Sequence, residues 1–258
     1  RDEHGRKMSK SYGNVIDPLP VMDELGTDAL RFTLLVGSTP GNDMNLALKK
    51  VESNRNFCNK IWNAGRFVIS ALDQSPERPL AEPEWTLADS WIWARLQGLV
   101  REVERLFQHH QYGEAGRQLY EFFWSDFADW YVEIAKHQLA QGGDRVFYTT
   151  YTLARTLDLS LRMLHPFAPF ITEELWGLLR QTVLDTYGEV ETYGVSMWPL
   201  HQDWKEALII TPWPTPRPVG GWEEPRIAEF TLIQEIVRAV RNLRAEKNVK
   251  PSKRLSAI

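Results

Sequence analysis

Residues 46–72, LALKKVESNRNFCNKIWNAGRFVISAL, decide the fold class of this chain. The stretch contains no proline, and its apolar side chains recur at intervals of three and four residues. Val51, Ile61, Val68 and Leu72 fall on one side, while the opposite side is polar. The pattern predicts one long amphipathic helix.

Helical patterns continue on both sides of this stretch. Short helices are expected over 19–25 and 27–36, the second with Thr27 as its N-cap. Further helices are expected at about 86–107, 114–139, from a cap at Asp144 to 164, and 171–184. Helices of this length joined by short turns are typical of an antiparallel bundle, so the predicted fold class is mainly α.

The remaining segments read as connections. Residues 73–83 hold three prolines and predict a linker. The pattern is lost over 185–222, where Leu208–Thr211 is expected to be a short extended run. A final helix is expected over 227–246, with a basic outer side, and residues 255–258 resemble the start of a strand.

Composition limits the class of protein. The 258 residues are 43% hydrophobic, enough for a full core, and no apolar run approaches the roughly 20 residues of a membrane-spanning helix. A single cysteine, Cys58, excludes an internal disulfide and favours a reducing compartment such as the cytoplasm. The net charge of −4 argues against a uniformly basic nucleic-acid binder, although segments 1–72 and 225–258 each carry an excess of Lys and Arg.

Lys7-Met8-Ser9-Lys10-Ser11 form a candidate phosphate-binding loop. Two ammonium groups three residues apart, with hydroxyls between and after them, can hold a polyphosphate while its negative charge redistributes. For an isolated Lys-x-x-Lys pattern, a solvated basic loop without function is the alternative.

The chain resembles the valyl-tRNA synthetases, which are class I aminoacyl-tRNA synthetases, over nearly its whole length. The resemblance rests on the order and spacing of Lys7–Ser11, Gly13–Pro18, Gly26–Arg31, Gly41–Asn45, Asn54–Ala64, His165–Trp176 and Arg241–Glu246. The runs at Gly41–Asn45 and Asn54–Phe57 favour a valine enzyme over an isoleucine or leucine one. These two enzymes, and a helical interaction module without an RNA role, remain the alternatives.

The resemblance implies an enzyme that activates valine with ATP, with Mg as counterion, and transfers valine to its tRNA. Lys10, with Lys7 as second cation, is then the catalytic group that offsets charge on the departing pyrophosphate. Ser9 and Ser11 are expected to donate to the ATP phosphates. No metal site is expected, because His109-His110 lacks the spacing of ligands.

The second candidate site is the polar face of residues 46–72. Helical spacing places one set of side chains in a row that offers cations, amides and a ring to single-stranded RNA. We call this row the polar stripe; it consists of Lys49, Ser53, Asn56, Lys60, Asn63 and Phe67. The helical domain of the family binds the tRNA anticodon, and the stripe is the expected contact; an ordinary solvated face with Phe67 turned into the core is the alternative.

Two weaker signals concern charged residues. Arg241 and Arg244 on the final helix are expected to contact the tRNA backbone, with plain surface as the alternative. Asp126, Asp129 and Glu133 share one helical side and are expected to form a charged face partnered by arginines, not an acid/base pair.

The His-x-Gly-His motif of class I synthetases does not occur in the chain, which opens on Arg1. The expectation is a piece of a longer enzyme, inactive alone, monomeric, and without bound ATP. The expected division is the end of the catalytic domain over 1–45, the anticodon-binding bundle over 46–184, an irregular connector over 185–222, and a basic helix with the start of a truncated subdomain over 223–258.

Overall fold

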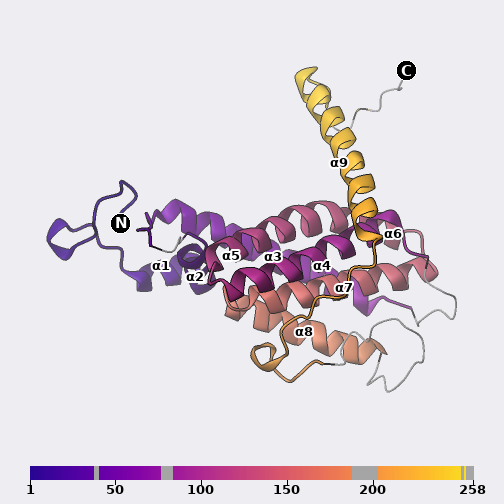
Figure 1. Cartoon of the computed structure of the whole chain (residues 1–258), viewed down its shortest axis with the longest axis horizontal. Coiled ribbons are helices and arrows are strands. Elements are labelled where there is room, and N and C mark those ends of the chain that lie inside the picture. Colours follow the sequence, from indigo (N-terminus) through magenta and orange to yellow (C-terminus); the bar gives the residue numbers. More distant parts are fainter. Residues whose placement is uncertain (38–40, 77–83, 188–202, 251–252, 254–258) are drawn as a thin grey trace.

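The computed structural model of the chain describes residues 1–37, 41–76, 84–187, 203–250 and 253. In those ranges all regular secondary structure is helical, as predicted, and the helices form a bundle (Figure 1). The amino-terminal loop lies at one end of the elongated body, and the last helix, α9, projects from it. The helices are α1 Pro18–Leu25, α2 Thr27–Val36, α3 Leu48–Asp73, α4 Leu87–Gln108, α5 Tyr112–Glu121, α6 Val132–Leu139, α7 Asp144–Leu164, α8 Pro169–Tyr187 and α9 Glu223–Glu246.

Helix α7 is the centre of the bundle, because nearly every side chain from Phe147 to Leu164 is buried. Two of its threonines donate within the helix: Thr150 Oγ1 to Val146 O and Thr152 Oγ1 to Tyr148 O, both at 2.9 Å. Burial all round is what a helix surrounded by others requires. The remaining long helices each bury only one side against the bundle.

Helix α2 packs against the bundle through an aromatic cluster. The ring of Phe32 lies 5.1 Å from that of Phe57 on α3 and 5.9 Å from that of Phe167, measured between centroids. Phe57 in turn lies 4.5 Å from Tyr120. Tilted rings at these distances add to the hydrophobic gain of burial. Helix α2 is therefore fixed to α3, which carries the polar stripe.

A buried polar network fixes the start of α4. Asp89, 1% exposed, accepts hydrogen bonds from Tyr131 Oη at 2.8 Å, Arg145 Nη1 at 2.7 Å and the backbone N of Thr86 at 3.0 Å. Thr86 Oγ1 accepts from Asp89 N at 3.1 Å, which completes a capping box. One carboxylate thus ties α4 to two other helices.

Several helix boundaries differ from the prediction. Gly26, with φ 92°, and not Thr27, is the N-cap of α2, and Gly143, with φ 60°, replaces Asp144 as the N-cap of α7. Both glycines adopt positive φ angles that favour glycine over any other residue. Leu208–Ile210 form a 3-10 turn, so the expected extended run there is wrong.

The helix predicted over 114–139 contains a π-helical segment, η2, over Phe122–Tyr131. Within this segment Phe122, Phe123 and Phe127 are buried, while Trp124 is only half-buried. The linker centre at 77–83, the run 188–202 and the expected strand at 255–258 lie outside the described residues.

Candidate phosphate-binding loop and nucleic-acid interface

Asp2 and Asn14 hold the candidate phosphate-binding loop in shape. The carboxylate of Asp2 accepts from Asn14 Nδ2 at 3.0 Å, from Arg6 N at 2.8 Å and from Arg6 Nε at 3.0 Å. The hydrogen bond from Asn14, with those from Arg6, lowers the pKa of Asp2 to about 2. Asn14 also donates to Lys7 O at 3.2 Å and accepts from Ser9 N at 2.9 Å, so it binds both ends of the turn.

This frame presents the two lysines to solvent. Ser9 Oγ accepts from Tyr12 N at 3.3 Å and caps a 3-10 turn, η1, over Lys10–Tyr12, which Gly13 closes at φ 65°. Lys7, Lys10 and Ser11 are exposed, whereas Ser9 is half-buried. Among the described residues, no acidic side chain pairs with the ammonium of Lys7 or Lys10. Both charges are therefore available to an anion, and the Ser9 hydroxyl proton can still be donated.

The polar stripe on α3 is only partly open. Lys49, Asn56 and Asn63 are exposed, as a readout face requires. Lys60, in contrast, is half-buried: its ammonium lies 4.7 Å from the centre of the Trp124 ring and forms an ion pair with Asp129.

Phe67 at the end of the stripe is partly buried and packs against the core. The ammonium of Lys136 lies 5.7 Å from its ring centre and pairs with Glu133 at 2.6 Å. Phe67 thus has protein on one side and a cation near its ring, so a base stacking on it would compete with Lys136.

The surface beside the stripe comes from the π-helix η2, which sequence reasoning did not connect with it. The ring of Trp124 stacks on that of Tyr120, with centroids 5.5 Å apart and planes at 18°. Asp129 faces Lys60, and Asp126 pairs with Arg95 at 2.8 Å. The expectation of arginine partners thus holds for Asp126 only, since Asp129 and Glu133 pair with lysines. The Phe122–Trp124 aromatic run was the signal for a surface ring here, but only the π-helical turn sets its direction.

The two arginines on α9 lie in different environments. Arg241 is exposed, and its guanidinium lies 5.7 Å from the centre of the Trp130 ring. Arg244 is half-buried and donates from Nη2 to Lys250 O at 2.7 Å and Lys253 O at 2.8 Å. Arg241 can therefore meet a phosphate directly, whereas Arg244 stabilises the chain that follows the helix.

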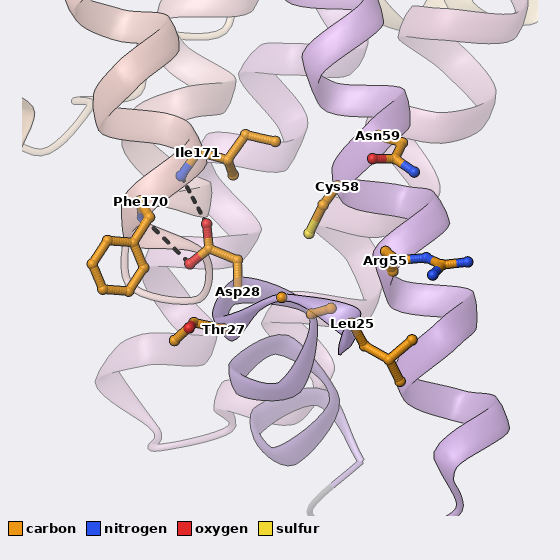
Figure 2. Close-up of a pocket in the computed structure, with 10 residues that line it drawn as sticks. Leu25, Thr27, Asp28, Arg55, Cys58, Asn59, Phe170 and Ile171 are labelled. Carbon is orange, nitrogen blue, oxygen red and sulfur yellow. Dashed lines mark hydrogen bonds between the residues drawn. The ribbon is translucent and has the colours of Figure 1, made fainter. Parts of the chain in front are cut away.

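A cavity of about 390 Å³ lies where α2 meets α3 and α8 (Figure 2). Its only carboxylate among the described lining, Asp28, accepts from Phe170 N at 3.3 Å and Ile171 N at 2.7 Å and so caps α8 from a different helix. Burial raises the pKa of Asp28, and burial raises the pKa of the Cys58 thiol to about 12. The Cys58 thiol is therefore protonated and a poor nucleophile at neutral pH.

Neither a metal site nor a membrane-spanning helix is found in the described part of the chain. No group of three His, Cys, Asp or Glu side chains there has the geometry to hold a metal ion. None of the described helices is both long enough and apolar enough to cross a membrane.

Comparison with protein families gives two matches that together cover most of the chain. Residues 89–258 match the anticodon-binding domain of tRNA ligase, and residues 1–47 match the class I tRNA synthetases for I, L, M and V. Among solved structures, the chain is similar in fold to a leucyl-tRNA synthetase of Agrobacterium radiobacter K84 in a ternary complex (TM-score 0.56, 23% identity, 88% of this chain and 23% of that one). It is also similar to Mycobacterium tuberculosis methionyl-tRNA synthetase with methionyl-adenylate (TM-score 0.58, 22% identity, 68% of this chain and 36% of that one).

Several curated sequences share a higher sequence identity with this chain than these solved structures do. A valine–tRNA ligase of Symbiobacterium thermophilum is 42% identical over 100% of this chain, and one of Geobacillus stearothermophilus is 42% identical over 98%. The chain spans only 28% and 26% of those two proteins. The chain therefore belongs to the family of tRNA-ligase anticodon-binding domains, preceded by a class I synthetase segment, and its relatives at this level of identity are valine–tRNA ligases.

Proposed function

We propose that this chain is the part of a valine–tRNA ligase that supplies the phosphate-binding loop of the catalytic domain and the anticodon-binding bundle. The division follows the expected one, with residues 1–45 ending the catalytic domain, 46–184 forming the bundle, 185–222 connecting and 223–258 opening a further subdomain. The single observation that carries the proposal is the loop itself: Lys7 and Lys10 stand in solvent on a turn that Asn14 clamps at both ends. Several valine–tRNA ligases at about 42% identity make an isoleucyl or leucyl enzyme the weaker candidate.

In this proposal the loop acts on ATP, with Mg as its counterion, when valine attacks to form valyl-adenylate. Negative charge grows on the departing pyrophosphate. The ammonium of Lys10, assisted by Lys7, opposes that charge, and the hydroxyls of Ser9 and Ser11 donate to phosphate oxygens. The exposed ammoniums and the clamped backbone fit this role, because they can approach a polyphosphate without first breaking an internal ion pair.

The proposed tRNA contact is formed by the polar stripe on α3 together with two arginines on α9, a helix that packs against α4. Lys49, Asn56 and Asn63 offer exposed charge and amides, while Arg241 offers an exposed guanidinium to the backbone. Three further residues are proposed to bind RNA: Lys60, Phe67 and Arg244. Each of them must first break, or bind alongside, its present contact within the protein.

The catalytic proposal is tested in a full-length ligase that contains this chain. Lys10→Ala should lower valine-dependent ATP–pyrophosphate exchange by about 10²-fold or more, the usual loss when one group opposing transition-state charge is removed. Lys205→Ala, which removes an equally exposed lysine from the connector, is the matched control and should keep the wild-type rate. Equal rates for Lys10→Ala and wild type would refute the role of the loop.

The binding proposal is tested on the chain itself, with a valine tRNA transcript in a filter assay. The affinity should fall as the salt concentration rises. Lys49→Ala should reduce the slope of log K against log salt by the amount that corresponds to one phosphate contact. A helical module without an RNA role would show no specific binding. The proposal also includes a monomer in the cytoplasm, and light scattering measures the first of these.

A further inference from the structure

Basic side chains from three different helices contact partners on one short stretch of the π-helical segment η2. One side chain comes from α3, one from α4 and one from α9, and their partners lie within positions 124–130. We call these three side chains the cationic track; they are Lys60, Arg95 and Arg241. The polar stripe on α3 and the arginines on α9 therefore border the same surface, although α9 itself packs against α4.

Arg95 is the member of the track that belongs to neither of the proposed tRNA contacts. Its side chain is 46% exposed, and Nε donates to Asp126 Oδ2 at 2.8 Å. Among the described residues, no acceptor binds the two Nη groups of Arg95. Arg95 is therefore held in place through one nitrogen, while the other two can donate to an anion.

Asp126 is the carboxylate that holds Arg95. Its side chain is only 15% exposed. Burial raises the pKa of Asp126, whereas the charges of Arg95 and of Arg238 on α9 oppose that rise. Asp126 thus interacts with cations from two helices, α4 and α9.

The acidic side chains around the track leave several guanidinium groups available. Two glutamates flank η2 and bind other cations; these ion pairs are Glu121–Arg117 and Glu133–Lys136. Arg238 and Arg241 have no carboxylate at ion-pair distance among the described residues, and Glu235, one turn before Arg238 on α9, pairs with neither of them. A polyanion could bind these guanidiniums without first displacing a carboxylate.

The partners of the track lie close together on η2. Asp126, Asp129 and Trp130 fall within five consecutive positions, and Cβ atoms three or four positions apart on a helix are about 5–6 Å from one another. Arg241 lies on the side of α9 that faces η2, because its guanidinium is 5.7 Å from the centre of the Trp130 ring. Successive phosphates of one RNA strand can therefore meet cations from all three helices.

We propose that Arg95 is a further contact to the phosphate backbone of tRNA, and that η2 is the surface on which the polar stripe and α9 act together. This inference rests on the proposed function, since it takes tRNA as the partner. The Nη groups of Arg95 donate to a phosphate while Nε keeps its bond to Asp126, so no internal ion pair has to break. The planar fork of a guanidinium matches phosphate oxygens, and such a contact does not depend on the base.

The test compares two variants in a filter assay with a valine tRNA transcript at several salt concentrations. Both carry Asp126→Asn, because Arg95→Gln alone would leave a buried carboxylate without its cation. The double variant Arg95→Gln/Asp126→Asn should bind about five- to eightfold more weakly at 0.1 M salt than Asp126→Asn does, since one phosphate contact is lost. The slope of log K against log salt should be smaller by about 0.7–0.9, a change that a purely structural role of Arg95 would not produce.

Arg105→Gln is the matched control. Arg105 lies on the same helix, about 15 Å further along, is also exposed, and pairs with Glu102 at 2.6 Å. This variant should keep the wild-type affinity and slope. Arg95→Lys/Asp126→Asn retains the charge but not the fork, so it should keep the slope of Asp126→Asn and lose only about two- to threefold in affinity.

Equal affinities and slopes of Asp126→Asn and Arg95→Gln/Asp126→Asn would overturn the inference, and so would a slope in the Lys variant as small as that in the Gln variant. A transcript with altered anticodon bases should lose the same factor as the valine transcript; a loss confined to the valine anticodon would also count against a backbone contact. If Lys49→Ala lowers the slope but Arg95→Gln/Asp126→Asn does not, this inference fails and the proposed function stands. If the wild-type chain does not bind the tRNA at all, both fail.

Discussion

Replacing Asp89 by asparagine should destabilise the bundle far more than its isosteric shape suggests. The Arg145 side chain is 14% exposed and loses the carboxylate that binds Nη1 at 2.7 Å. Removing one partner of a buried pair costs about 3–5 kcal/mol. Arg145 keeps a hydrogen bond to Glu84 O, and the new amide oxygen can still accept from Tyr131, so we expect the lower end, about 3 kcal/mol.

The measurement is urea unfolding of the chain followed by circular dichroism, with a thermal scan beside it. A loss of about 3 kcal/mol lowers the melting temperature by about 6–12 °C in a protein of this size. Asp126→Asn is the matched control: it makes the same chemical change in a pair with Arg95, whose side chain is 46% exposed, and burial already raises the pKa of Asp126. That variant should lose less than about 1 kcal/mol.

Equal losses of unfolding free energy in the two variants would refute this prediction. The double variant gives a second check. Adding Arg145→Met to Asp89→Asn should recover part of the loss, because no buried cation is then left without its carboxylate. If the losses of unfolding free energy in Asp89→Asn and Arg145→Met simply add up in the double variant, the two side chains act independently.

Three further predictions concern the loop, the stripe and the cysteine. Asp129→Asn frees Lys60 and should tighten tRNA binding about two- to fivefold in a filter assay, since exposed pairs are worth up to about 1 kcal/mol; weaker binding would contradict this. Cys58, with its pKa raised to about 12, should not react with iodoacetamide at pH 8 in the folded chain but should react in urea. The pKa of Asp2 is lowered to about 2, so its carboxylate stabilises the loop above about pH 4, and this contribution is lost as the pH falls towards 2. The Asn14 side-chain amide signal in NMR should shift over that range and not at pH 5–7.

Elements with a strong, uninterrupted period could be predicted from the sequence. Helix α3 was predicted over 46–72 and is found over Leu48–Asp73, because a proline-free amphipathic pattern leaves few alternatives. The caps were predicted less well: Thr27 and Asp144 have the right side chains, but the preceding glycines take the positive φ angles from which the chain enters each helix.

The candidate sites divide in the same way. The residues of the phosphate-binding loop are consecutive in the sequence, so the loop could be predicted from one short run. The partners of the polar stripe are not local, since Asp129 lies 69 residues from Lys60 along the chain. Asp129 and Trp124 lie on a π-helical segment, and this segment leaves no simple period in the sequence.

The environment of Lys60 determines whether its ammonium can bind an RNA phosphate. A fully buried ion pair would hold its ammonium too strongly, because breaking it costs several kcal/mol. Here the lysine side chain is 26% exposed and that of Asp129 is 49% exposed, so the pair is worth at most about 1 kcal/mol after screening by solvent. A phosphate can replace the carboxylate at little cost, while the Trp124 ring, 4.7 Å away, keeps the ammonium in place through the exchange. The pair is therefore weak enough to open and holds Lys60 at the edge of the stripe, where an incoming phosphate would meet it.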